Sequence, residues 1–376
     1  MESDIASLLK QLVSVKSTYP DEKEIGEYLF QLFQSHNYNP KKQIVENNRF
    51  NLTVQKGHGK KSVLLYSHLD TVNVVEGWQT DPLELNIKNG KAFGLGAWDM
   101  KGGMAVNILT FLRFHPKNFR LKLVFCVDEE NISKGVQTLI KTNFINDVDC
   151  VISPEPAFDY GLRGIVTGRI GRAVYNIEIK GESRHFALYE KMYDINLFAA
   201  EFLVQISRLN RIIGHRKQFI FARKIISEAV GMSIPPKTCI QLDSSVLPPN
   251  THNQILDCLA GIGKNLSKKY GNYFSVKLGF LQRDTPFLES YQIKDNNPYL
   301  KLLKKSIGQK TGLAAQDYFR SSVADENVFG SHGKTVLGIG AHGGNAHAAN
   351  EWVSLSSLEK LYIILNSFLE KVNTQI

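Results

Sequence analysis

Cysteine is scarce in this sequence, and long apolar runs are missing from it. The four cysteines, at positions 126, 150, 239 and 258, form no C-x-x-C pair, so the sequence predicts neither a zinc ribbon nor a disulfide framework. No run of about 18 apolar residues occurs, which excludes a membrane-spanning helix. The first ten residues carry acids and have the pattern of an amphipathic helix, unlike a signal peptide. These absences favour a reducing, cytoplasmic setting.

The sequence also lacks the features that concentrate positive charge for nucleic-acid binding. Its net charge is +9, yet the lysines are scattered, and neither an Arg-rich arm nor an aromatic RNA-binding motif accompanies them. Lysines solvated on the surface explain this pattern better than a nucleic-acid site does. The excess charge also suits an anionic substrate or an acidic partner protein.

What the sequence does contain is enough apolar material for two domains. Of its 376 residues, 43% are hydrophobic. Between residues 51 and 152, buried-strand patterns alternate with helical patterns, which indicates an α/β fold with a mixed, mostly parallel sheet flanked by helices. From residue 174 the strand patterns alternate as half-exposed strands do, with helical patterns at 195–209 and 253–269. We expect a main domain of residues 1–170 and 286–376 with an inserted α+β domain of residues 171–285.

Five apolar stretches are each followed in the sequence by side chains of the types that bind metals. They cover residues 62–66, 92–97, 121–127, 150–153 and 335–340, and the side chains that follow them are His68 and Asp70, Asp99, the acids at 128–130, Glu155, and His342 and His347. Such stretches are typical of buried strands. Ligands of open α/β sheets bind beyond the carboxyl ends of the strands. The five together predict a metal centre on the rim of one sheet.

The first three motifs have plainer interpretations when each is taken alone. His68 and Asp70 share a face of an extended chain, so Asp70 is placed to orient a ligating imidazole, yet the pair also fits an ordinary strand end. Asp99 lies among glycines that let a carboxylate approach two cations, but the segment equally fits a plain turn. Three adjacent acids at 128–130 repel one another unless a cation is bound, although solvated acidic loops are common.

The last two motifs also allow two interpretations when each is taken alone. Glu155 lies between two prolines on stiff backbone, as a surface glutamate of a Pro-rich turn would. His347, with Glu351 four residues later, is a further imidazole ligand or an exposed loop histidine. Taken together, two histidines and at least three carboxylates suit two metal ions better than one. Imidazole favours Zn²⁺, Co²⁺ or Mn²⁺ over Mg²⁺ or Ca²⁺.

The motifs and their order resemble one enzyme family over nearly the whole chain. They are SHLDTV at 67–72, GAWDMKGG at 96–103, DEE at 128–130, SPEP at 153–156 and HAANE at 347–351. The family is that of the dizinc peptidases and deacylases, which includes acetylornithine deacetylase, succinyl-diaminopimelate desuccinylase, aminoacylase and carboxypeptidase G. The resemblance implies a catalytic main domain, an inserted lid through which a homodimer forms, and two divalent ions, foremost zinc, with cobalt or manganese as alternatives.

The resemblance also implies a role for each site residue. The metal ligands that it implies are His68, Asp99, Glu130, Glu155 and His347. Asp99 bridges the ions, His68 and Glu155 complete one site, and Glu130 and His347 complete the other. Glu129 is the general base for a metal-activated water. Asp70 orients and tunes His68.

In the inserted domain, the resemblance is carried by GESRH at 181–185. This segment is similar to the family's Gly-x-x-x-His, whose histidine reaches across a dimer to the oxyanion of the tetrahedral intermediate. The similarity implies a catalytic role for His185, which otherwise fits a satisfied surface histidine. Many relatives carry Asp-x-Arg before a proline, and Ser245 stands at that Arg position here, so the Arg cannot be carried over. Arg169 or Arg172 would then clamp a substrate carboxylate.

The prediction for function is a dizinc amidohydrolase that cleaves the amide bond of an N-acyl amino acid. A glutamate at position 155 is more typical of deacylases and carboxypeptidase G than of aminopeptidase-like relatives, which often have Asp. The alternatives are a metallo-dipeptidase or carboxypeptidase, release of an amino acid from an acidic carrier protein, and a binding protein with a vestigial site. The intact ligand set counts against the last of these. The expected partners are a small substrate and a second copy of the chain, with neither nucleic acid nor membrane.

Overall fold

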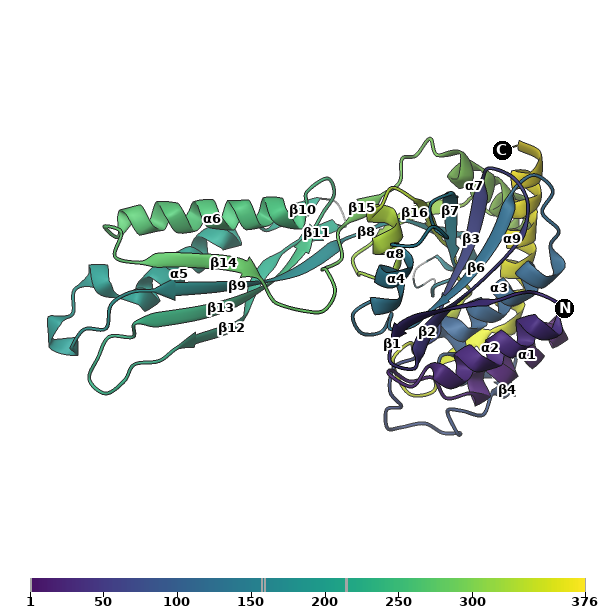
Figure 1. Cartoon of the computed structure of the whole chain (residues 1–376), viewed down its shortest axis with the longest axis horizontal. Coiled ribbons are helices and arrows are strands. Elements are labelled where there is room, and N and C mark those ends of the chain that lie inside the picture. Colours follow the sequence, from purple (N-terminus) through teal and green to yellow (C-terminus); the bar gives the residue numbers. More distant parts are fainter. Residues whose placement is uncertain (1, 157, 159, 214–215, 376) are drawn as a thin grey trace. The chain divides into compact units, whose positions relative to one another are not determined.

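A computed structural model describes residues 2–156, 158, 160–213 and 216–375, and the chain divides into two compact units (Figure 1). Unit 1 consists of Met1–Gly168, Ile293–Tyr318 and Ala324–Ile376, and unit 2 of Arg169–Gln292 and Phe319–Val323. Residues 169–170, 286–292 and 319–323 lie within the range that we expected in the main domain, but they belong to unit 2.

Unit 1 is built on a mixed sheet. Its strands follow the order β1-β2-β6-β3-β7-β17-β8. Their bounds are β1 (Lys41–Glu46), β2 (Arg49–Gly57), β3 (Ser62–His68), β6 (Arg120–Cys126), β7 (Val148–Ser153), β8 (Gly164–Arg169) and β17 (Thr335–Gly338), and the short β16 (Gln316–Arg320) pairs with β8. The four central strands β6, β3, β7 and β17 are mutually parallel, whereas β1, β2 and β8 pair antiparallel. The predicted fold class is confirmed.

Helices cover both faces of this sheet, which is why its central strands are apolar along their whole length. Val63 and Leu65 of β3 point into the core formed with one group of helices, while Tyr66 points to the other face, where its ring packs on Phe329 at 5.6 Å between centroids. The first group comprises α1 (Glu2–Ser14), α2 (Lys23–Ser35), α3 (Gly102–Arg113), α7 (Pro298–Thr311) and α9 (Leu355–Gln375). The short α4 (Lys134–Leu139) and α8 (Glu326–Ser331) lie on the opposite face (Figure 1).

The prediction that residues 92–97 form a strand of the central sheet is wrong. Only β5 (Lys91–Phe93) is extended there, and it belongs to a separate small sheet of order β18-β19-β5-β4, with β4 (Asn86–Lys88), β18 (Gly343–Gly344) and β19 (Trp352–Ser354). The glycines end the strand, since Gly96 adopts a left-handed φ of 72° and a Cβ there would lie 2.5 Å from a methyl carbon of Thr71. A single π-helical turn, η1 (Ala97–Lys101), then leads into α3. The other four apolar stretches are strands of the central sheet, as predicted.

Unit 2 is a four-stranded antiparallel sheet with two helices packed on one face (Figure 1). Its strands run in the order β12 (Ile220–Ser227), β13 (Lys237–Val246), β9 (Gly171–Lys180) and β14 (Ser275–Phe280). The helices of unit 2 are α5 (Ile195–Ser207) and α6 (His252–Lys269). Its smaller elements are η3 (Phe186–Leu188), η4 (Lys191–Tyr193), β10 (Arg211–Ile213), β11 (Arg216–Gln218) and β15 (Tyr291–Gln292). A further short element, η2 (Gly161–Arg163), belongs to unit 1. Tyr175, Ile177, Phe198 and Phe202 contribute to the core of this unit.

The edge strand β12 escaped the sequence analysis. Most of its side chains are exposed, and the register shifts between Ala222 and Lys224, which breaks the alternation that marks a strand. Among the described residues, no helix combines the length and the apolar character needed to cross a membrane.

Candidate metal centre

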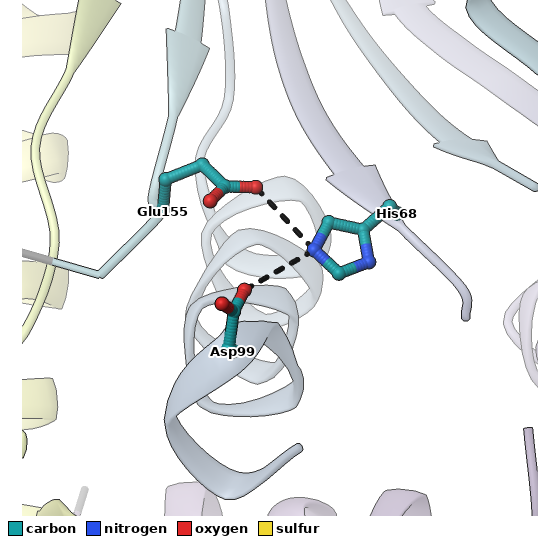
Figure 2. Close-up of side chains that lie close together, drawn as sticks. All are labelled: His68, Asp99 and Glu155. Atoms are coloured by element: carbon teal, nitrogen blue, oxygen red, sulfur yellow. Dashed lines mark hydrogen bonds and ion pairs between the residues drawn. The ribbon is translucent and has the colours of Figure 1, made fainter. Parts of the chain in front are cut away.

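The first group of predicted ligands converges at the carboxyl end of the central sheet. His68 is the last residue of β3, Glu155 follows β7, and Asp99 lies in the π-helical turn η1. His68 Nε2 lies 3.3 Å from Asp99 Oδ1 and 3.3 Å from Glu155 Oε1, and Figure 2 shows both carboxylates pointing at this ring nitrogen. One donor atom from each residue lies within 4.8 Å of the others, so the three could hold one ion.

The second group shares Asp99 with the first. His347 Nε2 lies 3.3 Å from Asp99 Oδ2 and 3.1 Å from Glu130 Oε1. The two carboxylate oxygens of Asp99 therefore face different histidines, Oδ1 towards His68 and Oδ2 towards His347. This is the arrangement that a carboxylate shared by two cations requires.

A third grouping of donors contains Glu129. His68, Glu129 and Glu130 also bring donor atoms within 4.8 Å of one another. Geometry alone therefore allows either neighbouring glutamate to act as a ligand. The division of roles, with Glu130 as a ligand and Glu129 as a base, stays a prediction from the family resemblance.

The electrostatics of the site reflect carboxylates crowded around two imidazoles. Burial would lower the pKa of His68, but the carboxylates of Asp99 and Glu155, each 3.3 Å from its Nε2, raise it well above its ordinary value. Hydrogen bonds with Asp99 and Glu130 raise the pKa of His347 to about 10. Burial opposes ionisation of Asp99, but the two histidines hold the pKa of this carboxyl below its usual range. Burial, reinforced by the charge of Glu155, raises the pKa of Glu129 well above normal.

These residues fit a pair of transition-metal ions. Glu155 Oε1 is buried and lacks a hydrogen-bond donor of good geometry in the described part of the chain, which is the state of a ligand atom turned towards a cation. The donors are imidazole nitrogens and carboxylate oxygens, the set that suits Zn²⁺, Co²⁺ and Mn²⁺. A bound ion would take over from the imidazoles the role of neutralising the carboxylates.

Asp70 contacts both His68 and the acidic loop, in a way that the sequence pattern did not predict. His68 Nδ1 lies 2.9 Å from the main-chain oxygen of Asp70 and 3.7 Å from its carboxylate. The carboxylate instead accepts the main-chain N–H groups of Glu129 at 3.1 Å and Glu130 at 2.8 Å. The main chain of Asp70 therefore orients the imidazole, while its side chain fixes the segment that carries the two glutamates.

Asp128 and His342, two of the candidate metal-binding side chains, are absent from the metal-binding groups among the described residues. Asp128 accepts a hydrogen bond from Arg49 Nη2 at 2.8 Å and from the main-chain N–H of Lys134 at 2.9 Å. Arg49 also donates to Glu22 at 2.8 Å. The ring of His342 packs edge-on against Trp352 at 5.4 Å between centroids. Neither residue belongs to the ligand set that the family resemblance implies, and these contacts agree with that set.

The buried Arg49–Glu22 pair, which supports the acidic loop through Asp128, was not predicted from the sequence. Arg49, Glu22 and Asp128 are 6%, 1% and 0% exposed. The one sequence signal was an arginine that begins the apolar strand β2, since a buried guanidinium needs carboxylate partners. Its partners lie 27 and 79 residues away in the sequence, and no local pattern identifies them.

The predicted site residues of unit 2 make contacts with other residues of that unit. His185 is exposed, its Nδ1 accepts the main-chain N–H of Ala187 at 3.3 Å, and its ring lies 4.9 Å from that of Phe186. Its catalytic role stays a prediction. Arg172 makes a two-pronged ion pair with Asp243, at 3.0 and 2.7 Å, so its guanidinium is engaged within the unit.

The two other lid positions singled out by the sequence analysis are also engaged within unit 2. Arg169 is buried and donates to Ser322 Oγ at 2.9 Å. Ser245, at the position of the family's Arg, donates to the carbonyl of Lys217 at 3.0 Å.

A comparison with protein families matches most of the chain. The profile of Peptidase family M20/M25/M40 matches residues 64–371, and the chain belongs to this family. It is a hydrolase, a metal-dependent amidohydrolase or exopeptidase, as the sequence analysis predicted.

Two related enzymes are distant from this chain in sequence but similar to it in length. A succinyl-diaminopimelate desuccinylase of Nautilia profundicola is 26% identical over 389 residues, which cover 98% of this chain and 100% of the relative. A probable succinyl-diaminopimelate desuccinylase of Staphylococcus epidermidis is 22% identical over 417 residues, covering 98% and 99%.

Solved structures share the fold over the whole chain. Aminopeptidase PepT of Bacillus cereus has a TM-score of 0.78 at 17% identity, covering 99% of both chains. A Bacillus subtilis protein described as a dinuclear metal binding peptidase of the M20 family has a TM-score of 0.75 at 11% identity, covering 100% of this chain and 99% of that one.

Proposed function

We propose that the chain is a dinuclear metal-dependent amidohydrolase that releases an amino acid from its N-acyl derivative. The observation that carries this proposal is the position of Asp99, whose two carboxylate oxygens face His68 and His347 at 3.3 Å each. Two ions bridged by Asp99 would bring Glu155 and Glu130 in as further ligands. The relatives named as succinyl-diaminopimelate desuccinylases support a deacylase over a peptidase.

The metals would supply an electrophile for the amide carbonyl and lower the pKa of a water molecule. The chain's own contribution is proton transfer and orientation. Glu129 is partly buried and has a carboxylate oxygen close to His68, so its carboxylate can accept the proton of the attacking water and return it to the leaving amine. In the metal-free chain, burial raises the pKa of Glu129, so its carboxylate is a stronger base than that of a solvated glutamate. Asp70 holds the main chain of Glu129 and thereby the direction of its side chain.

Zinc is the first candidate metal, with cobalt and manganese as alternatives, and its binding should strengthen as pH rises. The pKa of His347 is about 10 in the folded chain because of Asp99 and Glu130, so an ion must displace its proton at neutral pH. Apparent affinity should rise about tenfold per pH unit for each proton released. Titration of chelator-treated protein with zinc at several values between about pH 6 and pH 9 measures this. A pH-independent affinity would contradict the proposed ligand role of His347.

The same pKa shift links pH to the stability of the metal-free fold. The folded pKa of His347, about 10, exceeds its ordinary value of 6.5. The stabilisation by its ion pairs is therefore complete below that ordinary value and is lost as pH rises through the folded pKa.

A substrate panel tests the proposed reaction. Zinc-loaded protein is offered N-acetyl and N-succinyl derivatives of basic, acidic and apolar amino acids, unmodified dipeptides, and an amino acid linked through an amide to an acidic peptide. We expect the N-acyl amino acids to be hydrolysed with the highest kcat/KM, and a chelator to abolish the activity. Faster hydrolysis of the dipeptides would replace the deacylase by a dipeptidase or carboxypeptidase, and activity that survives complete metal removal would refute the mechanism.

The amino acid linked to an acidic peptide is included in the panel because unit 2 carries a positive net charge. Of the formal net charge of +9, this unit contributes +8, with 18 Lys and Arg residues against 10 Asp and Glu residues. A basic unit attracts anionic partners, so the acidic carrier substrate remains the second candidate. Preference for the peptide-linked substrate at low salt, lost at high salt, would favour the carrier reaction.

We further propose that the chain acts as a homodimer formed through unit 2, in which His185 contacts the oxyanion of the reaction. The edge strand β12 supports this, because among the described residues it is the last strand of its sheet on one side, and it exposes Phe221, Ile225 and Ile226. An exposed apolar edge strand is a template for pairing with another chain.

A further inference from the structure

Glu351 closes the sequence motif that contains His347, but its carboxylate is not among the metal-binding groups of the described residues. It is 1% exposed and receives three main-chain N–H groups. Gly96 donates to Oε2, and Trp98 and Asp99 donate to Oε1, each at 2.8 Å. The main-chain oxygen of Glu351 accepts a fourth N–H, from Gly94 at 3.0 Å.

These bonds are directed at the segment that carries Asp99. Asp99 has φ −117° and ψ 90° inside the π-helical turn, so its backbone departs from helical geometry. A helical hydrogen-bond ladder therefore does not set its position, and the N–H groups need another acceptor. The carboxylate of Glu351 provides it, and hydrogen bonds to an ionised acceptor are the strong kind.

Glu351 is itself fixed on the other side by the small sheet. The next residue, Trp352, begins β19, which pairs with β5 in the register Trp352 to Phe93. One segment therefore presents His347 to the site and also holds the main chain of Asp99. Because His347 Nε2 and Asp99 Oδ2 lie 3.3 Å apart, a shift of this segment would change the geometry of both.

We propose that Glu351 is a positioning residue that fixes Asp99 relative to His347 and so sets the spacing of the two metal positions. This inference depends on the proposed role of Asp99 as the shared ligand. Both carboxylate oxygens are needed for it. A glutamine would turn its NH₂ group towards either Gly96 or the pair Trp98 and Asp99, which are donors themselves, and those hydrogen bonds would be lost.

The test compares Glu351→Gln with Glu351→Asp and with Glu370→Gln, a matched change at an exposed position of α9. The readouts are zinc affinity by competition with a chromophoric chelator, the visible absorption of the cobalt-loaded protein, and kcat against KM. We expect Glu351→Gln to bind zinc about 10- to 100-fold more weakly, as loss of an outer support of a metal ligand does, with a changed cobalt spectrum and a lower kcat. Glu370→Gln should match the unaltered chain.

Glu351→Asp keeps the charge and both oxygens while shortening the side chain. We expect Glu351→Asp to recover part of the zinc affinity that Glu351→Gln loses. A role of Glu351 in folding alone would not lead to such a partial recovery of metal binding. Unchanged affinity and cobalt spectrum in Glu351→Gln would overturn the inference. If Glu351→Gln does not fold, an Asp variant with normal affinity and spectrum would overturn it equally. Should the unaltered chain bind metal but hydrolyse no substrate, the proposed function fails while the positioning inference stands on the metal readouts.

Discussion

Replacement of Glu129 by glutamine should lower kcat by about 10²- to 10⁴-fold, the range typical of a lost general base, while metal content stays the same. Glutamine has the shape of glutamate but cannot accept the proton of the attacking water. The main-chain N–H that Glu129 donates to Asp70 is unaffected by the change, so the loop should stay in place. Steady-state kinetics and elemental analysis of the same preparation measure the two quantities.

The control for this variant is Glu84→Gln, which alters an exposed glutamate and should leave kcat unchanged. Loss of one ion together with activity in Glu129→Gln would instead make Glu129 a ligand, as the grouping of His68, Glu129 and Glu130 permits. The variant also tests the proposed dimer. Mixed and reassociated with an inactive His185→Ala variant, it should regain activity, since one active site of the hybrid would contain both intact residues. Absence of recovery in demonstrated hybrids would refute action of His185 across a dimer.

Asp99→Asn should have a still larger effect, because it removes negative charge from both metal positions at once. An amide retains one oxygen but not a second anionic donor, and the electrophilic assistance of an ion is worth several kcal/mol. Since about 1.4 kcal/mol corresponds to tenfold in rate, we expect kcat/KM to fall by about 10³-fold or more. Zinc affinity should fall at both positions and not at one, which calorimetric titration of the metal-free protein measures.

An exposed aspartate of unit 2 offers the matched control, Asp257→Asn, for which we expect unchanged affinity and rate. A variant of Asp99 that loses one ion and retains the other with normal affinity would contradict the role of a shared ligand. In that case two independent sites, one with His68 and one with His347, would describe the centre better.

The sequence predicted the strands of unit 1 well where burial on both faces makes them apolar throughout, as in β3 and β7. It failed at residues 92–97, where an apolar run continues through Gly94 and Gly96 although the backbone turns. It also failed at β12, because an exposed edge strand with a register shift lacks the alternation that a half-buried strand requires. Both failures occur where local composition and tertiary environment disagree.

For the site, the structure brings His68, Asp99 and Glu155 together, as expected from the sequence. What the sequence could not provide is where the supporting carboxylates point. The carboxylates of Asp70 and Glu351 both accept main-chain N–H groups of the segments that carry the proposed ligands. These contacts join residues that are far apart in the sequence. An acidic side chain beside a ligand in the sequence is therefore as readily a support for the backbone as a ligand itself.

The place of β17 in the sheet has a consequence for biosynthesis. This strand lies between β7 and β8, although it is made after all of unit 2. During translation the gap between β7 and β8 stays open until residue 338 has left the ribosome, and His347 and Glu351 arrive later still. A nascent or truncated chain thus exposes the unpaired edge of an apolar strand, which is prone to aggregation. If His347 is a ligand, as proposed, the two-metal centre cannot be completed before β17 has been synthesised, because His347 follows this strand in the sequence.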